Sequence, residues 1–476
     1  MSAAAPQLQL VEARCYERPV KFRLPFRFGA VTVTDAPQAF VRVRIRTNDG
    51  REAEGVAAEL LAPKWFDKSP ALTHEQNFAQ LRRSLGLARR HLLAAGTNTA
   101  FGLSATVDAG HHAACAAAGL NGLIASFGLA LHERAIIDGF GRLLGEDVFT
   151  LARTNRLGLT GTALPDLDGF DLTTFLDRLR PAPMIAARHT VGLVDALTRA
   201  DLAPAQRLDD GLPETLEEAV EAYGHRHFKL KVAGAIDADV ERLAGIADVL
   251  DRAVGDYKVT LDGNEQFEHV GAVVELWRRI GEDARLARLK ASILFVEQPI
   301  ARARALAEPV HALAREVPME IDESDADMDA FARARALGYR GISSKSCKGF
   351  YRALLNRARV ASWNSEDGAA RYFMSAEDLT TQGGVAVQQD LALATLIGAT
   401  HVERNGHHYV DGMAGAPTIE QEAFLAAHPR LYRRASGRVR LAIGAGEIDT
   451  ASLAHVPGLA VGPMPDFDAM HPMPTE

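Results

Sequence analysis

The fold of this chain is decided by five short segments, which read HFKLKVA (227–233), YKVTLD (257–262), ILFVEQP (293–299), PMEIDES (318–324) and YRGISSK (339–345). Each is a short apolar run that ends in charged or polar residues, a pattern typical of a buried strand in a parallel sheet. Stretches of helical period separate them, the clearest being residues 236–254. Strands that alternate with helices predict parallel pairing through right-handed crossovers.

The same alternation extends outward from these five segments. HTVGLVD (189–195) precedes them, and RYFMSAED (371–378) and HVER (401–404) follow them. Eight candidate strands with seven helices between them therefore end near Arg404. Eight units within about 220 residues fit a (β/α)8 barrel of the α/β class better than an open sheet.

The first part of the chain has a different pattern. Residues 39–47 (AFVRVRIRT) alternate apolar and charged side chains, Asn48-Asp49-Gly50 predicts a hairpin turn, and residues 52–58 predict the return strand. A helical pattern then occupies about 73–145, and the prolines near residue 180 mark a boundary. We therefore predict an α+β domain over 1–185, the barrel over 186–405, and a C-terminal segment over 406–476 that folds back on the first domain.

Composition excludes several classes of protein. The 476 residues carry a net charge of −8 with 24% charged residues, which argues against a nucleic-acid or anionic-membrane partner. Residues 113–131 are rich in Ala and Gly, so we expect a buried helical hairpin and not a membrane span. The start lacks the features of a secretory signal, and the three cysteines are far apart, so we expect a reducing, cytoplasmic setting. Homo-oligomerisation is left open.

Charged residues end successive strands of the predicted barrel. Lys231 is followed one unit at a time by Asp262, Glu297, Asp322 and Lys345. A single acid after a strand is usually a helix cap or a loop residue, but active sites of such barrels lie at these strand ends. Burying three carboxylates together is costly unless a cation compensates them, and oxygen ligands suit Mg²⁺.

The motifs KLK, DGN, EQP, DES and KSCK, in this order on strands two to six, resemble the enolase superfamily. Within it, the chain is most similar to the branch of mandelate racemase and muconate-lactonizing enzyme. Residues 26–50 and the helical region after them resemble the capping domain of that family. The resemblance implies a Mg²⁺-dependent enzyme that removes the proton alpha to a carboxylate through a metal-stabilised enediolate. Racemisation, epimerisation or cycloisomerisation would follow.

The resemblance also implies roles for individual residues. Asp262, Glu297 and Asp322 match the positions that bind one Mg²⁺ per active site. Lys231 and Lys345 match the acid/base groups on the two faces of the substrate. A lysine with an ordinary pKa is protonated at neutral pH, so a base of this kind needs surroundings that disfavour its charge.

Further positions match groups that surround the substrate. Lys229 matches the residue that neutralises the substrate carboxylate and lowers the pKa of its neighbour. The expected substrate-binding residues are Asn264, Glu323, Glu377, Asp378 and Trp65. The last of these lies in the segment LAPKWFDK (61–68), which resembles one of the two specificity loops of the cap; the other loop lies around Phe28-Gly29.

Several residues depart from the family pattern or have a structural role. The seventh strand carries no histidine, so the two-lysine arrangement of muconate-lactonizing enzymes fits better than that of mandelate racemase. Glu403-Arg404-Asn405 lacks the Asp-x-Asp of dipeptide epimerases. We expect structural roles for His407 and His408 and packing for Cys347. Lys348 is either a loop charge or a group that supports the site residues, and the loop charge is favoured.

Three other functions are considered. An acid-sugar dehydratase shares the metal and the proton abstraction but loses water. A Schiff-base or pyridoxal-phosphate barrel would use Lys231 or Lys345 covalently, and the three spaced carboxylates argue against it. A barrel kept only as a binding protein would not need both the carboxylates and the lysines.

Overall fold

The computed structural model describes residues 5–28, 31–377, 382–404 and 409–474. Its centre is a closed barrel of eight parallel strands, β4 (Met184–Val191), β5 (His227–Lys231), β6 (Lys258–Asp262), β7 (Ile293–Glu297), β8 (Met319–Ile321), β9 (Gly341–Ser344), β10 (Phe373–Ala376) and β11 (His401–Glu403). Pairing of β11 with β4 closes the ring. The predicted (β/α)8 barrel is confirmed.

Helices connect the barrel strands, at α6 (Leu216–Tyr223), α7 (Ile236–Ala253), α8 (Val270–Glu282), α9 (Ala287–Ala291), α10 (Arg302–Ala305), α11 (His311–Ala314), α12 (Ala330–Ala336), α13 (Phe350–Asp367) and α14 (Val385–Leu396). Alternation along each strand sends one set of side chains to these helices and the other into the ring. On β5, Phe228 and Leu230 are fully buried among helix residues such as Leu243. Lys229 and Lys231 therefore face the interior of the barrel.

The first barrel strand differs from its prediction. It runs over Met184–Val191 and not over residues 189–195. The short tail strand β14 (Glu447–Asp449) pairs antiparallel with its first half, at Met184, Ile185 and Ala186. A partner so distant in sequence leaves no signal in the local pattern.

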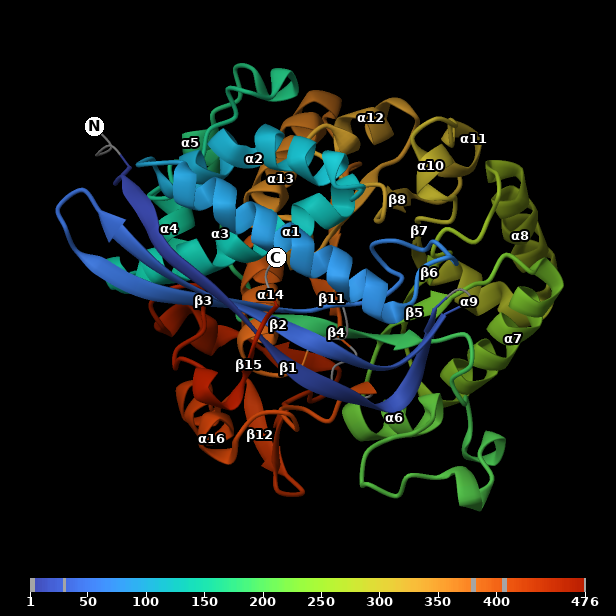
Figure 1. Ribbon diagram of the computed structural model, residues 1–476. Coiled ribbons are helices and arrows are strands. Elements are labelled where there is room, and N and C mark those ends of the chain that lie inside the picture. The colour runs from blue at the N-terminus through green and yellow to red at the C-terminus, as the bar shows by residue number, and fades with distance from the viewer. Residues whose placement is uncertain (1–4, 29–30, 378–381, 405–408, 475–476) are drawn as a thin grey trace.

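The cap contains an antiparallel sheet of β1 (Leu8–Phe28), β2 (Val31–Thr47), β3 (Glu52–Leu60) and the tail strand β15 (His471–Pro472), in the order β15-β1-β2-β3. Three helices, α1 (His74–Ala94), α2 (Ala100–Ala117) and α3 (Gly122–Leu144), lie beside this sheet (Figure 1). The predicted hairpin at residues 48–50 joins β2 to β3, and α2 with α3 is the predicted helical hairpin. Among the described residues, no helix is both long and apolar enough to cross a membrane.

The tail contacts both other parts of the chain. Besides β14 and β15 it contributes α16 (Thr418–Ala427) and the hairpin of β12 (Tyr432–Ala435) and β13 (Arg438–Leu441). Arg18 of β1 donates to both carboxylate oxygens of Glu420, at 2.8 and 2.7 Å, in a buried pair. The boundaries at 185 and 405 stay a prediction.

Candidate active site

The charged side chains at the strand ends lie at the same height along the barrel axis, because the residues that carry them are paired directly across neighbouring strands. Lys231 is opposite Asp262 on the neighbouring strand, and Asp262 is opposite Glu297 on the next. A pocket at this end of the barrel is lined on the barrel side by Lys229, Lys231, Asp262, Asn264, Asp322, Lys345, Glu377 and Glu403. The cap closes the other side with residues of β1, β2, β3 and the segment 61–68.

Lys229 is the centre of the charge network. Its Nζ lies 3.0 Å from Asp262 Oδ2 and 2.8 Å from Glu297 Oε1. The same Nζ lies 3.1 Å from Glu403 Oε2 and also donates to Glu377. Burial would lower the pKa of Lys229, but these four carboxylates raise it well above the ordinary value. The ammonium therefore holds together acids that would otherwise repel one another.

The two expected acid/base lysines line the same pocket. Lys231 Nζ lies 2.5 Å from Asp262 Oδ2, the oxygen that Lys229 also contacts. Lys345 Nζ lies 3.0 Å from Asp322 Oδ1 and 2.5 Å from Glu377 Oε2. Each lysine is thus held by a carboxylate on a neighbouring strand or loop.

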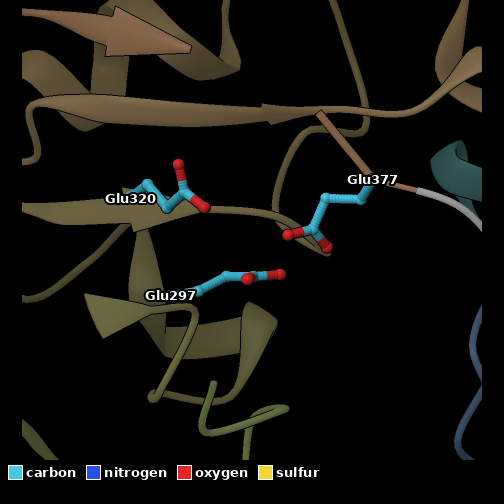
Figure 2. A group of neighbouring side chains, drawn as sticks. All are labelled: Glu297, Glu320 and Glu377. Carbon is cyan, nitrogen blue, oxygen red and sulfur yellow. The ribbon is translucent and has the colours of Figure 1, made fainter. Parts of the chain in front are cut away.

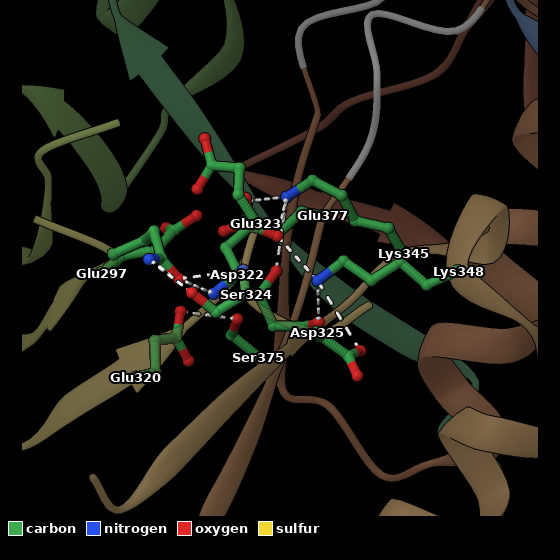
Figure 3. Close-up of polar contacts among 12 residues, drawn as sticks. Glu297, Glu320, Asp322, Glu323, Ser324, Asp325, Lys345, Lys348, Ser375 and Glu377 are labelled. Atoms are coloured by element: carbon green, nitrogen blue, oxygen red, sulfur yellow. Dashed lines mark hydrogen bonds and ion pairs between the residues drawn. The ribbon is translucent and has the colours of Figure 1, made fainter. Parts of the chain in front are cut away.

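Lys348 is buried against Asp322, so the favoured interpretation as a loop charge is wrong and the alternative, a group that supports the site residues, agrees with its contacts. It is 2% exposed, and its Nζ lies 2.7 Å from Asp322 Oδ1 and 2.7 Å from the carbonyl oxygen of Ser343. The turn after β9 is a short 3-10 helix at residues 346–348, which points Lys348 back toward the barrel beside Lys345 (Figure 3). Burial would raise the pKa of Asp322, but the two ammonium groups lower it.

Glu297, Glu320 and Glu377 form a buried acidic cluster within the barrel, with carboxylate oxygens within 4.8 Å of one another. Their carboxyl groups point toward a common centre (Figure 2). Burial and the charge of Glu377 raise the pKa of Glu320 to about 8, and Ser375 donates to its Oε1 at 2.9 Å. Burial together with Asp262 and Glu377 also raises the pKa of Glu297.

The donor chemistry of the site fits a hard divalent cation. Asp262, Glu297 and Asp322 offer only carboxylate oxygens, which Mg²⁺ prefers. The Oε2 atom of Glu320, beside Glu297, is buried without a hydrogen bond. Burial is the main cause of the raised pKa of Glu297 and Glu320, and neighbouring carboxylates add to it; a bound cation would favour the charged form of these two groups. Among the described residues, the carboxylates that lie close enough together to share one cation are Glu297, Glu320 and Glu377. That Asp262, Glu297 and Asp322 hold Mg²⁺ stays a prediction.

The cap segment 61–68 is tied to the barrel mouth. Arg302 donates to the carbonyl oxygens of Trp65 at 2.8 Å and Phe66 at 2.9 Å, and it pairs with Glu265 at 2.7 Å. Lys68 Nζ lies 2.6 Å from the same Glu265. The Trp65 ring consequently covers the pocket, with its centroid 5.3 Å from the Nζ of Lys345.

The backbone at the mouth is strained at three positions. Asn264, Glu265 and Gln298 have φ values of 40°, 69° and 30°, in the left-handed region that non-glycine residues rarely adopt. They follow β6 and β7 directly, next to Asp262 and Glu297. Strain of this kind is typical of functional sites, where the surrounding structure holds it in place.

Of the remaining residues that the sequence analysis singled out, some lie beside the pocket and others lie outside the described residues. Glu323 is buried under the cap segment and accepts from Lys68 at 3.0 Å. Cys347 is buried, and burial raises the pKa of its thiol. Asp378, His407 and His408 lie outside the described residues.

Two residues of the network escaped the sequence analysis. Arg188 of β4 donates to Glu377 Oε1 at 2.6 Å, and Glu320 belongs to the acidic cluster with Glu297 and Glu377. The sequence could have indicated Glu320. It is two residues from Asp322, as Lys229 is from Lys231, so strand alternation places both side chains on the face that points into the barrel. Arg188 lies in the part of β4 that the sequence did not predict as a strand.

Comparison with known proteins agrees with this architecture. Residues 211–358 match the model of the family described as enolase C-terminal domain-like. The predicted resemblance to the enolase superfamily is confirmed. No curated protein sequence matches the chain.

Solved structures with this fold superpose over almost the whole chain. A dipeptide epimerase from Enterococcus faecalis V583, complexed with Mg and L-Leu-L-Tyr, has 14% identity and a TM-score of 0.59, covering 96% of this chain and 100% of its own. A muconate lactonizing enzyme from Pseudomonas fluorescens, complexed with muconolactone, has 16% identity and a TM-score of 0.59, covering 97% and 98%. An enolase from Bradyrhizobium, complexed with magnesium and mandelic acid, has 18% identity and a TM-score of 0.57, covering 98% of both chains.

Proposed function

We propose that this chain is a Mg²⁺-dependent enzyme that removes the proton alpha to a carboxylate and then racemises, epimerises or cycloisomerises its substrate. The observation that carries the proposal is the shared pocket of Lys231, Lys345, Asp262 and Asp322. The printed ligands of the similar structures, a dipeptide, muconolactone and mandelic acid, support a small carboxylate as the substrate.

The two lysines supply the proton transfers. Strands β5 and β9 are four places apart in a ring of eight, so Lys231 and Lys345 approach a substrate between them from opposite sides. One lysine in its amine form accepts the proton, and the other in its ammonium form donates a proton to the opposite face. If a β-leaving group departs instead, the same pair supports elimination, and where the leaving group stays attached elsewhere in the same molecule the outcome is a cycloisomerisation.

The remaining groups orient the substrate and exclude water. Asp262, Glu297 and Asp322 would hold Mg²⁺, which neutralises charge on the substrate carboxylate when it is bound. Lys229 fixes Asp262 and Glu297 through ion pairs of 3.0 and 2.8 Å. The apolar cap wall covers the pocket and lowers the local polarity around the lysines.

Solvent-deuterium exchange at the α-carbon tests this function. A panel of chiral carboxylates is incubated in D₂O with enzyme and Mg²⁺, and NMR reads loss of the α-proton. Lys231→Ala and Lys345→Ala should each abolish interconversion, while each variant still exchanges one enantiomer. If the wild-type protein exchanges the α-proton of no carboxylate in the panel, in either enantiomer, the proposed function is overturned. Exchange of both enantiomers by Lys345→Ala overturns the role of that lysine.

Two accompanying expectations stay predictions. We expect one Mg²⁺ per active site. A cytoplasmic location agrees with the three cysteines, which are all free and buried. Equilibrium dialysis would measure the first, and fractionation of the native cell would measure the second.

A further inference from the structure

The described side chains that the cap contributes to the wall of the pocket are hydrocarbon or aromatic. Its members are Phe22, Phe26, Val33, Leu60, Ala62, Pro63 and Trp65. Among these side chains the indole N–H of Trp65 is the sole hydrogen-bond donor, and no side chain is an acceptor. A substituent with several hydroxyl groups would lose its hydrogen bonds to water here without replacement.

Cations of the cap near this wall are paired with other groups. Arg23, next to Phe22 on β1, lies 2.5 Å from Asp210 Oδ2. Lys68, at the end of the cap segment, lies 3.0 Å from Glu323 Oε1. Within the described residues, the lining of the pocket on the cap side therefore contains no cation for a second substrate carboxylate.

The acidic groups of the barrel side are not available to a substrate amine. Glu403 on β11 accepts from Lys229 at 3.1 Å and also from Thr190. A substrate ammonium in the pocket would instead lie beside the ammonium group of Lys345, which is already paired with Asp322 and Glu377. Like charges this close repel each other strongly in a buried site.

The free space in the pocket is small. Its volume is about 50 Å³, which is on the order of four water-sized spheres. Trp65 limits it, and the ring of Trp65 is itself held edge-on by Phe66 at a centroid distance of 4.7 Å. A short substituent fits this volume better than an aromatic ring.

We infer that the substrate is a monocarboxylate whose substituent, facing the cap, is a short hydrocarbon without a second charge and without several hydroxyl groups. This inference rests on the proposed function, since it names the substrate class of the same pocket. It disfavours acid sugars, dicarboxylates and dipeptides with a free amine.

A series on one carbon skeleton tests this class. Four acids share the 2-hydroxy carboxylate and four carbons: 2-hydroxybutanoate, malate, threonate and 4-amino-2-hydroxybutanoate. Thermal midpoints of the wild-type protein with Mg²⁺ are titrated with each acid, and deuterium exchange is read in the same samples. We expect 2-hydroxybutanoate to bind at least tenfold more tightly than the other three.

The two readouts separate the two claims. Equal or tighter binding of malate, threonate or the amine, or no binding of 2-hydroxybutanoate, overturns the inferred class. Selective binding of 2-hydroxybutanoate supports the class whether or not its α-proton exchanges. Absence of exchange with every carboxylate tested overturns the function alone.

Variants of Trp65 test the size limit. Trp65→Ala should admit mandelate, with its aromatic ring, and improve its binding at least tenfold relative to 2-hydroxybutanoate. Trp277→Ala is the matched control, because Trp277 lies on the outer helix α8 and donates to Glu316 at 2.7 Å. If Trp65→Ala does not fold, Trp65→Leu replaces it. Unchanged selectivity in a folded Trp65 variant overturns the role of this residue in limiting the substituent.

Discussion

The Nζ of Lys348 lies 2.7 Å from the Oδ1 of Asp322, in an ion pair whose two side chains are 2% and 1% exposed. Lys345 contacts the same oxygen at 3.0 Å. Asp322 therefore meets two ammonium groups, and the second lysine of the KSCK motif is part of the site.

Replacement of Lys348 by Met should destabilise the metal-free protein. The change leaves Lys345 as a remaining ammonium partner of the buried Asp322, so we expect a loss below the cost of leaving a buried charge uncompensated, which is about 3–5 kcal/mol. Thermal unfolding in EDTA measures it, with Lys258→Met as the control because Lys258 is exposed. Equal melting temperatures of the Lys348 variant and the wild type would contradict the prediction.

Mg²⁺ should stabilise the wild-type protein, and Asp322→Asn should remove that effect. A ligand at a hundred times its dissociation constant contributes about 2.7 kcal/mol to the folded state. The difference between melting temperatures with Mg²⁺ and with EDTA is compared for both proteins. Asp248→Asn is the control, since the side chain of Asp248 is 68% exposed on α7. A full Mg²⁺ shift in Asp322→Asn would exclude Asp322 as a ligand.

Sequence reasoning located the strand ends because each βα unit repeats one local pattern. A short apolar run followed by an acid or a lysine needs no tertiary information to be recognised, so Asp262, Glu297 and Asp322 could be placed on consecutive strands. Lys348 was misplaced because local sequence does not show that residues 346–348 form a tight turn. The hydrogen bonds from Arg302 to the carbonyl oxygens of Trp65 and Phe66 could not be predicted either. They join residues more than 200 positions apart, which come together only in the folded chain.

Arg302→Gln should loosen the cap segment without unfolding the barrel. The variant loses two donors to the carbonyl oxygens of Trp65 and Phe66 and the ion pair with Glu265. Limited proteolysis should cut within residues 61–72 several times faster than in the wild type. Arg278→Gln is the control, because the pairs of Arg278 with Glu275 and Glu282 are exposed on α8. Identical cleavage rates would show that the segment is held by other contacts.

Gly55→Ala should disrupt the packing of the cap. A Cβ at Gly55 would overlap the carbonyl oxygen of Ala135 and the backbone nitrogen of Gly139, because α3 crosses β3 in direct backbone contact. Overpacking of a rigid core typically costs about 1–3 kcal/mol, and backbone atoms have little room to move. Gly255→Ala is the control, since nothing lies within 4 Å of its added Cβ. A melting temperature equal to that of the control would contradict this close contact.

Acidification should weaken the cap through His132 of α3. This side chain is fully buried, its Nδ1 bonds the carbonyl oxygen of Gly128 at 2.8 Å, and its Nε2 has no hydrogen bond. Burial lowers the pKa of His132 from 6.5 to about 4. Below pH 6.5 the unfolded chain binds a proton at this residue and the folded chain does not, so the free energy of unfolding falls as the pH drops toward 4.

His132→Leu removes this titration. The full effect of His132 between pH 6.5 and pH 4 is about 3 kcal/mol. Unfolding midpoints at pH 7.0, 5.5 and 4.5 should therefore fall less steeply for His132→Leu than for the wild type. Carboxylates titrate alike in both proteins, so the difference between the two slopes isolates the histidine. His455→Leu, at an exposed position, should keep the wild-type slope. Parallel slopes for all three proteins would show that His132 is protonated in the folded state over this range.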